Sequence, residues 1–187
     1  MIPEAVMESN YFFLETARLG FRAWREDNLP LAMELWTDVR VTGFFGGPYS
    51  PEQVVARLVR EMADQRDSGI QYWPIFLLAD GRHVGVCGLR PWKPGVPELG
   101  FHLRPEFWRM GLAFEAATAV IRYGFGRLGA TAIFAGHHPE NVASGALLLK
   151  LGFQYAGEEV YPVSGMLEPT YLLHPVDVSG EVGSKIG

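Results

Sequence analysis

The chain has 187 residues and a single cysteine, Cys87, which excludes an internal disulfide. No apolar run reaches the roughly 18 residues that a membrane-spanning helix needs, although the mean hydropathy is slightly positive at +0.06. Lysine and arginine form no cluster and the net charge is −5, which argues against broad nucleic-acid binding. Residues 1–15 lack the basic start and continuous apolar segment of a secretion signal. We therefore expect a soluble, cytoplasmic protein without nucleic-acid or membrane partners.

Hydrophobic and aromatic residues, by contrast, are plentiful. They make up 48% and 13% of the chain, which is enough to fill one core, and 187 residues are too few for two ordinary domains. We expect a lead-in at residues 1–15, one domain at residues 16–173 and a flexible tail at residues 174–187. Cys87 lies in an apolar segment, which favours a packed core thiol over a nucleophile.

Alternating and helical hydrophobic patterns follow one another through the expected domain. Its cap and turn signals are Asp27 before a helix, Ser50 with Gln53 as a capping box, and the tight turn at residues 80–81. Strands are expected at residues 18–24, 72–79, 82–90, 98–103, 130–136, 154–161 and 168–173, and helices at residues 27–37, 50–67, 111–128 and 141–151. Residues 41–49, rich in glycine and aromatic residues, are expected to form a loop. This order predicts a mixed α/β fold.

The segment 98–115, which reads ELGFHLRPEFWRMGLAFE, joins an expected strand to an expected helix. The first turn of a helix carries backbone N–H groups without an intrahelical acceptor, together with the positive end of the helix dipole. Gly111 and Ala113 are small enough to let an anionic group approach these N–H groups. Taken alone, the two are also ordinary turn and packing residues. If the segment binds a ligand, its chemistry suits phosphate.

Two further motifs strengthen that hypothesis. Residues 108–116 read WRMGLAFEA, residues 139–144 read PENVAS, and residues 150–153 read KLGF. In this order they resemble the GNAT superfamily of acyl-CoA-dependent N-acyltransferases, and more closely its ribosomal-protein-alanine acetyltransferase-like branch, over roughly residues 16–173. The resemblance implies a mostly antiparallel central sheet of about seven strands with helices on both faces.

The resemblance also implies how the cosubstrate, acetyl-CoA, would bind. The strand at residues 98–103 would separate from the strand at residues 130–136, and its backbone groups would hold the pantetheine arm. The N–H groups of the loop 109–114 would hold the diphosphate, and Asn141, which is also a good helix cap, would contact the arm. The residues assigned to the coenzyme are Phe101, His102, Leu103, Arg109, Met110, Gly111, Leu112, Ala113, Phe114, Asn141 and Ser144.

Two residues of this loop depart from the family pattern. Arg109 stands where glycine is usual, and Met110 where a basic residue is usual. Arg109 either makes a charge-assisted contact with phosphate or is a solvated loop residue. A positive φ at this position would strain it.

The catalytic groups are also implied by the resemblance. Glu98 stands where the branch places a carboxylate facing the amine, and we expect it to take a proton from the acceptor ammonium, directly or through water. The alternative is a strand-edge carboxylate that meets solvent. Leu148 replaces the tyrosine that many members use to protonate the departing thiolate. Ser144, more weakly His138, or water would supply that proton instead.

The resemblance implies only the class of acceptor, which is a primary amine on a protein N-terminus or on a small molecule. This amine would attack the thioester directly in a ternary complex. The aromatic residues Phe44, Tyr49 and Trp92 are expected in loops, where they would shape the acceptor pocket. No metal is expected, because His137 and His138 are strand neighbours that point to opposite faces. The protein is expected to be a monomer or a homodimer.

A second function class stays open: a non-catalytic acyl-CoA-binding module or sensor, suggested by the missing tyrosine and the altered loop.

Overall fold

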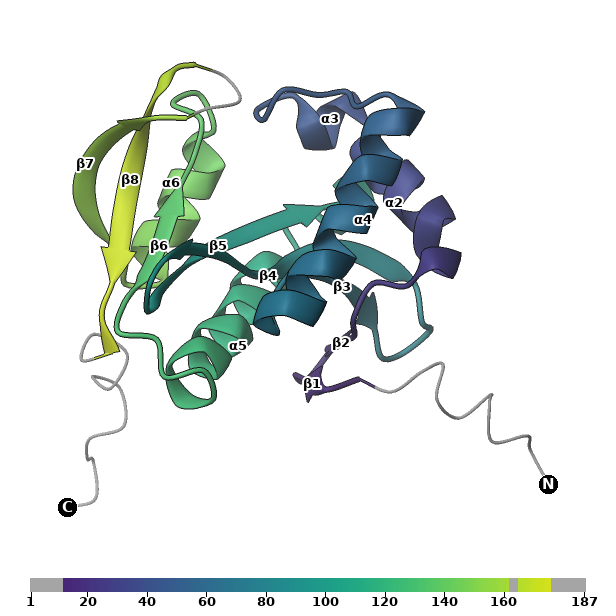
Figure 1. The fold of residues 1–187 in the computed structure, drawn as a ribbon, viewed down its shortest axis with the longest axis horizontal. Helices are drawn as coiled ribbons and strands as arrows, with labels where there is room; N and C mark the ends of the chain where they lie inside the picture. Colours follow the sequence, from purple (N-terminus) through teal and green to yellow (C-terminus); the bar gives the residue numbers. More distant parts are fainter. Residues whose placement is uncertain (1–11, 162–164, 176–187) are drawn as a thin grey trace.

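The computed structural model of the chain describes residues 12–161 and 165–175 (Figure 1). Eight strands form one sheet in the order β1-β2-β3-β4-β5-β6-β8-β7. The strands are β1 (Leu14–Glu15), β2 (Leu19–Phe21), β3 (Tyr72–Leu77), β4 (His83–Lys93), β5 (Val96–Leu103), β6 (Ile133–Gly136), β7 (Gln154–Val160) and β8 (Leu167–Leu173). The helices are α2 (Leu29–Trp36), α3 (Val39–Thr42), α4 (Pro51–Ser68), α5 (Leu112–Gly126) and α6 (Val142–Lys150), with 3-10 turns η2 (Glu26–Asn28) and η3 (Pro105–Phe107).

Neighbouring strands run antiparallel except for β5 and β6, which run parallel. These two strands are paired at one position, Glu98 with Phe134, and they diverge beyond it (Figure 1). On its other edge β5 stays paired with β4 as far as Leu103, which lies opposite Gly85. Because successive backbone groups of a strand point to alternate edges, some of those in β5 beyond Glu98 face away from β4 into the divergence.

The predicted mixed α/β fold, with a mostly antiparallel sheet and helices on both faces, is confirmed. The sheet has eight strands instead of about seven. The additional strand is β1, which lies in the predicted lead-in and has too few residues to show an alternating pattern. Just before it, Phe13 packs against Trp73 with 5.0 Å between ring centroids. The sheet therefore begins ahead of the expected boundary at residue 16.

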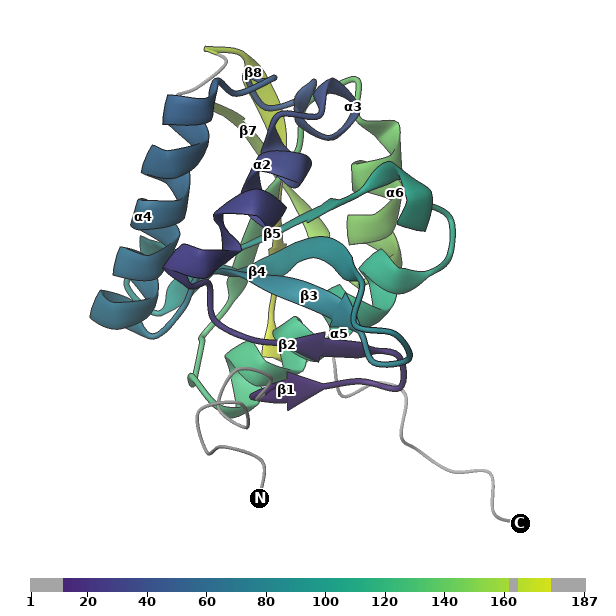
Figure 2. The ribbon, with the colours of Figure 1, turned by 90° about the vertical axis from the view of Figure 1, so that its right-hand side faces the viewer.

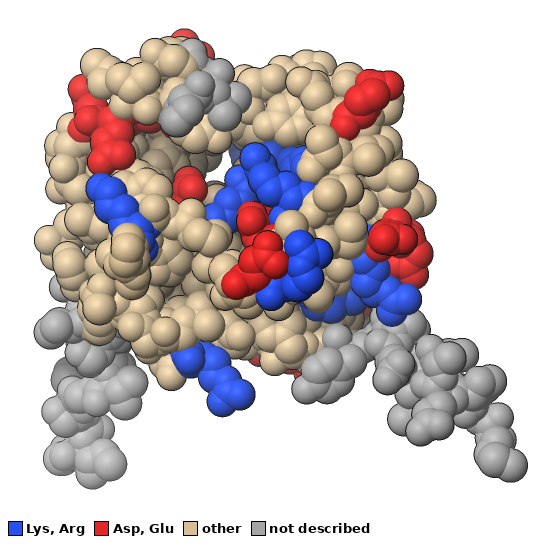
Figure 3. Space-filling view, in the orientation of Figure 1, with Lys and Arg blue, Asp and Glu red and all other residues tan. Residues whose placement is uncertain are grey.

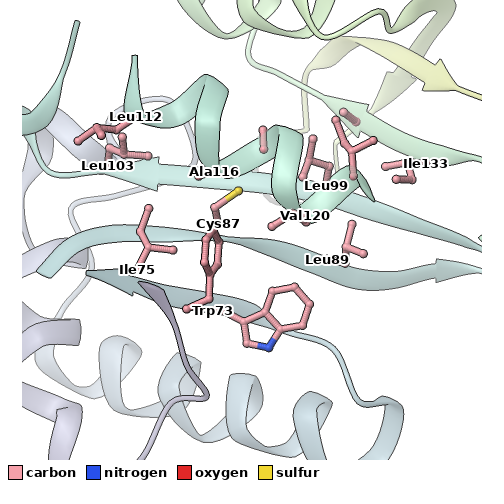
Figure 4. Close-up of a cluster of buried hydrophobic side chains, with 14 of the residues drawn as sticks. Trp73, Ile75, Cys87, Leu89, Leu99, Leu103, Leu112, Ala116, Val120 and Ile133 are labelled. Carbon is pink, nitrogen blue, oxygen red and sulfur yellow. The ribbon is translucent and has the colours of Figure 1, made fainter. Parts of the chain in front are cut away.

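Helices α2 and α4 cover one face of the sheet, and α5 and α6 cover the other (Figure 2). The larger hydrophobic cluster lies on the α5 side, where Cys87 of β4 packs with Ala116 and Val120 of α5 (Figure 4). Cys87 is fully buried, so its prediction as a packed core thiol is confirmed. The smaller cluster, on the α2 and α4 side, contains Trp36 and Tyr72.

Helix α4 begins and ends at the residues that its sequence signals named. Ser50 Oγ accepts a hydrogen bond from the Gln53 N–H at 3.3 Å, and Gln53 Oε1 accepts one from the Ser50 N–H at 2.8 Å. The predicted capping box is thus confirmed. At the other end Gly69 has a φ of 74°, the left-handed conformation that suits glycine after a helix.

Replacing Ser50 with alanine is expected to lower the free energy of unfolding by about 0.5–2 kcal/mol, because the Gln53 N–H at the start of α4 loses its side-chain acceptor. Urea denaturation measures this change. Ser68→Ala is the matched control, since the Ser68 hydroxyl donates to the Asp64 carbonyl and caps no N–H group. Equal losses in the two variants would contradict a specific role for the capping box.

Three local expectations are wrong. Asp27 caps no helix: it lies in η2, where it accepts a bond from Asn28 Nδ2 at 3.0 Å, and no side chain caps α2. Residues 41–49 are not loop throughout, because α3 extends to Thr42 and is capped by Asp38, which accepts a bond from the Arg40 N–H at 2.9 Å. A single helical turn is too short to show a period. The strand expected at residues 18–24 is limited to Leu19–Phe21 and is buried on both faces.

The two ends of the chain are described only in part. Residues 1–11 of the predicted lead-in and residues 176–187 of the predicted tail lie outside the described residues. Within the described part, none of the helices combines the length and the apolar character needed to cross a membrane.

Candidate active site

The loop between β5 and α5 presents a row of unpaired backbone N–H groups. After η3, Arg109 has a φ of 60° and Gly111 a φ of 76°, and α5 begins at Leu112. Within residues 12–161 and 165–175, the N–H groups of residues 109–114 donate to no backbone or side-chain acceptor. They lie at the positive end of the α5 dipole, an arrangement that suits phosphate groups.

Side chains leave this loop open. Arg109, Met110 and Gly111 are all exposed. The indole N–H of Trp108 donates to the Leu103 carbonyl at 2.7 Å and so ties the loop to the end of β5. This bond engages the carbonyl of Leu103, one of the three residues whose backbone was expected to hold the pantetheine arm.

Arg109 carries the strain that a positive φ imposes on a residue with a Cβ atom. It is the only non-glycine residue with a positive φ in the described part of the chain. The residue after it is held in place, because the Met110 carbonyl accepts a bond from Arg18 Nη1 at 3.0 Å. The loop conformation therefore depends on contacts from elsewhere in the fold.

Helix α6 joins the second motif, at its start, to the third motif, at its end. Asn141 is the N-cap of α6, as predicted, and its Oδ1 accepts a bond from the Ser144 N–H at 3.2 Å. At the other end of α6, Lys150 Nζ lies 4.7 Å from the centre of the Phe114 ring. The fold thus brings the third motif, through one cationic side chain, against the first turn of α5.

Glu98 lies at the point where β5 and β6 part, opposite Phe134 on β6 and Arg90 on β4. Its side chain is largely buried, so it is not a strand-edge carboxylate in open solvent. Burial raises the pKa of Glu98 above its ordinary value of 4.5; the Arg90 charge lowers it and the Glu168 charge raises it further. A carboxylate with a raised pKa is a better proton acceptor.

Alternate residues of β5 after Glu98 share its face of the sheet. The Tyr72 ring lies on Gly100, where a Cβ atom would be 2.2 Å from Tyr72 Cζ, so no larger residue fits there. The same ring contacts the Arg90 guanidinium, whose carbon lies 4.0 Å from the ring centre. His102 stacks on Phe45 at 4.1 Å, and burial lowers the pKa of His102 well below its ordinary value. Its imidazole is therefore neutral near pH 7.

Next to this face, two arginines share one fully buried carboxylate. Glu61 of α4 accepts a bond from Arg90 and lies 3.6 Å from Arg57 Nε. Arg57 also lies over the Trp36 ring at 4.4 Å and donates to the Tyr49 hydroxyl at 3.3 Å. The pairing compensates for the burial of these charges. In Figure 3, basic side chains gather beside a hollow between the α3–α4 side and the β7–β8 side, and acidic side chains lie near it.

Comparison with known proteins decides the family. The acetyltransferase (GNAT) domain matches residues 18–154. The chain belongs to the GNAT acetyltransferase family. An uncharacterised N-acetyltransferase of Bacillus subtilis (strain 168), YoaA, is 33% identical over 149 residues, which cover 77% of this chain and 84% of the relative.

Solved structures of GNAT proteins share the fold. RimL, a ribosomal L7/L12 alpha-N-protein acetyltransferase in complex with coenzyme A, has a TM-score of 0.75 at 16% identity, covering 88% of this chain and 98% of that chain. Spermidine N-acetyltransferase from Vibrio cholerae, in complex with CoA and spermine, has a TM-score of 0.74 at 17% identity, covering 87% and 99%. At these identities the likeness establishes the fold.

One of the three aromatic residues predicted to line the acceptor pocket of this GNAT chain is not in a loop. Trp92 lies in β4, because the β4–β5 hairpin continues past an irregularity to Lys93 opposite Val96. It stacks on Phe134 with 3.9 Å between ring centroids and 8° between planes. Since Phe134 is the partner of Glu98, Trp92 stands beside the point of divergence.

The remaining predicted residues are only partly brought together. Tyr49 follows α3 and reaches the charged network through Arg57. Phe44 lies 5.4 Å from His138, centre to centre, and His138 Nδ1 accepts a bond from the Glu140 N–H at 3.2 Å. Neither His138 nor Ser144 is bonded to Glu98 among the described residues. Leu148, at the family's tyrosine position, is 1% exposed in the core.

Neither group of charged contacts at this site was predicted from the sequence. Arg57 and Glu61 are four residues apart on one helix, a spacing that joins side chains on the helix surface and could have been noticed. The contacts of Arg18 with Glu115 join residues 97 positions apart, and no local pattern indicates such a pair.

Proposed function

We propose that this GNAT chain is an acetyl-CoA-dependent N-acetyltransferase that acetylates a primary amine in the cytoplasm. One observation carries the proposal: the open row of N–H groups at residues 109–114 adjoins the strand that bears Glu98 where β5 leaves β6. A diphosphate needs several donors and no crowding side chain, and this loop provides both. The divergence leaves backbone groups of β5 available to an extended amide-bearing arm.

Acetyl-CoA supplies an acyl group that is already activated as a thioester. The N–H groups of Arg109, Met110, Gly111, Leu112, Ala113 and Phe114 bind the diphosphate, with a further charge from Lys150. Backbone groups of Phe101 and His102 bind the pantetheine arm, and the side chain of Asn141 contacts it while capping α6. An N–H near Gly100 or Phe101 stabilises the acyl oxygen as negative charge develops there.

Glu98 is the general base in this proposal. It accepts the proton that the acceptor ammonium must lose before its nitrogen can attack, directly or through one water. Its burial and raised pKa fit that role. The proton for the departing sulfur comes from Ser144, His138 or water, since Leu148 cannot donate one. Positioning supplies most of the rate, because the thioester is reactive by itself.

The acceptor is a primary amine on a protein N-terminus or a small molecule. RimL and the Vibrio cholerae spermidine enzyme are named for one acceptor of each kind. Tyr49, Trp92 and Phe44 shape the pocket for it. The largely buried Glu98 provides the negative charge that an ammonium group needs as it enters.

A second function is favoured by one observation. Leu148 is buried in the core at the position of the family's tyrosine acid. A GNAT chain that binds an acyl-CoA without turning it over, as a sensor, would not need that hydroxyl. The two functions share the coenzyme site and differ in turnover.

Acetyl-CoA at about 100 times its dissociation constant is expected to stabilise the folded chain by about 2.7 kcal/mol, seen as a rise in Tm. A panel of peptides with free N-termini, polyamines and amino sugars is then tested for thiol release from acetyl-CoA. Release with at least one class supports the enzyme. Stabilisation without release by any amine supports the sensor, and no stabilisation at all contradicts both functions.

A further inference from the structure

Arg18, just before β2, contacts the coenzyme loop although it lies far from it in the sequence. Its Nη1 donates to the Met110 carbonyl at 3.0 Å, while Nε and Nη2 reach Glu115 Oε2 at 2.7 and 2.6 Å. A Cβ atom at Gly111 would lie 3.6 Å from Arg18 Nη2. The guanidinium therefore spans from the strained part of the loop to the first turn of α5.

The bond to Met110 fixes the direction of the next N–H group. The Met110 carbonyl and the Gly111 N–H belong to one trans peptide unit and point in opposite directions. Since Arg18 holds the carbonyl on the β2 side, the Gly111 N–H points to the other side of the loop. The bond also lies next to Arg109, so it helps to hold the positive φ that this residue would otherwise avoid.

Glu115 needs these contacts for a different reason. It lies in the first turn of α5, and an uncompensated carboxylate there would repel a diphosphate on the same turn. Its Oε1 accepts bonds from Thr16 Oγ1 at 2.6 Å and from the Arg18 N–H at 2.9 Å, in addition to the guanidinium on Oε2. Burial raises the pKa of Glu115, but the bonds from Thr16 and Arg18 outweigh it, and the pKa is lowered overall. The carboxylate stays ionised, neutralised and turned toward the β1–β2 turn.

An ion pair with its arginine 46% exposed contributes little to stability by itself. The Arg18–Glu115 pair differs from an ordinary surface pair in its geometry. The Arg18 guanidinium contacts Met110 as well as Glu115, and four donors from Thr16 and Arg18 bind the Glu115 carboxylate. The effect of this pair falls on the arrangement of the loop more than on the free energy of unfolding.

We infer that Arg18 is a positioning residue for coenzyme binding: by joining the Met110 carbonyl to Glu115, it holds the strained 109–111 loop in the conformation that presents its N–H groups to the diphosphate. The inference rests on the proposed coenzyme site and adds a residue to it that touches no reacting atom. It also assigns a purpose to the β1–β2 turn, which lies outside the loop and helix that form the site.

The test measures the dissociation constant of coenzyme A by calorimetry for wild type, Arg18→Gln, Arg18→Lys and Arg18→Gln with Arg109→Gly. Arg18→Gln is expected to weaken binding about tenfold, as expected for the loss of charge-assisted bonds. Arg18→Lys, which keeps the charge but cannot make both contacts, is expected to weaken it almost as much. Adding Arg109→Gly removes the backbone strain and is expected to restore affinity to within about threefold of wild type. Arg66→Gln, in an exposed pair with Asp67 on α4, is the control and should bind as wild type does.

The outcomes separate the inference from the proposal beneath it. If wild type binds no coenzyme A, the proposed function fails, whatever Arg18 does. If wild type binds and Arg18→Gln binds equally well, the positioning role alone is overturned. The role is also overturned if Arg18→Gln weakens binding but Arg109→Gly gives no recovery, or if Arg18→Lys binds as wild type does, because Arg18 would then act through its charge. Under steady-state turnover, a positioning role raises the KM for acetyl-CoA and leaves the KM for the amine unchanged.

Discussion

Glu98→Gln is expected to lower kcat/KM for the amine by about 100- to 10,000-fold while the dissociation constant of coenzyme A stays within about twofold of wild type. Glutamine keeps the shape and polarity of the side chain but accepts no proton at neutral pH. The residue lies at the divergence of β5 and β6, away from the loop that we propose binds the diphosphate, so coenzyme affinity is not expected to depend on it. Thiol release and calorimetry on the same two proteins measure the two effects.

The role of Glu98 as a base also predicts in which direction kcat/KM changes with pH. A general base works only when deprotonated, so kcat/KM rises with pH through the pKa of Glu98. Because burial raises that pKa above 4.5, the acid limb of wild type is expected above pH 4.5 and is absent in Glu98→Gln. The Glu168 charge contributes to the raised pKa, so Glu168→Gln is expected to move the limb to lower pH.

Glu158→Gln is the control for that shift, since Glu158 is exposed on β7 and does not contribute to the pKa of Glu98. A Glu98→Gln protein with wild-type turnover and an unchanged acid limb would rule out Glu98 as the base. Loss of coenzyme binding in Glu98→Gln would place the residue in the coenzyme site and would contradict the assigned role as well.

The fold was predictable wherever the signal lies within one element. The capping box of α4 needs only Ser50 and Gln53, which are three residues apart, and both partners bond as their types require. Strand β1 and helix α3 were missed because two and four residues show no period. Both are held by tertiary packing instead, as the contact of Phe13 with Trp73 illustrates.

The candidate site divides in the same way. The open loop before α5 follows from its own glycine, its alanine and the helix after it, so the sequence was enough to indicate it as a candidate for binding the coenzyme. The charged surroundings of Glu98 were not predictable, because Arg57 and Glu61 come from α4 and Arg90 from β4, and a sheet register brings them together. Trp92 was placed in a loop because proline residues on both sides hide the continuation of β4. Its stacking on Phe134 depends on the same register.

Gly111→Leu is expected to abolish the rise in Tm that acetyl-CoA produces. Gly111 has a φ of 76°, so a leucine there would be strained, and its Cβ would lie 3.6 Å from Arg18 Nη2. The added side chain would therefore disturb the loop conformation that presents the exposed N–H groups. Diphosphate binding needs close approach to the backbone, so the loss should exceed that of Arg18→Gln, which only releases the loop. Thermal shift with and without acetyl-CoA measures the effect.

Gly69→Leu is the matched control, because Gly69 has a φ of 74°, has no atom within 4 Å of its would-be Cβ, and ends α4 away from the loop. Both variants are expected to lose about 1–2 kcal/mol of stability from the left-handed conformation alone. Only Gly111→Leu should also lose the response to acetyl-CoA, so the difference between the two reports the bulk added at the loop. A Gly111→Leu protein that responds as wild type does would show that the diphosphate lies elsewhere, and the proposed enzyme would lose its coenzyme site.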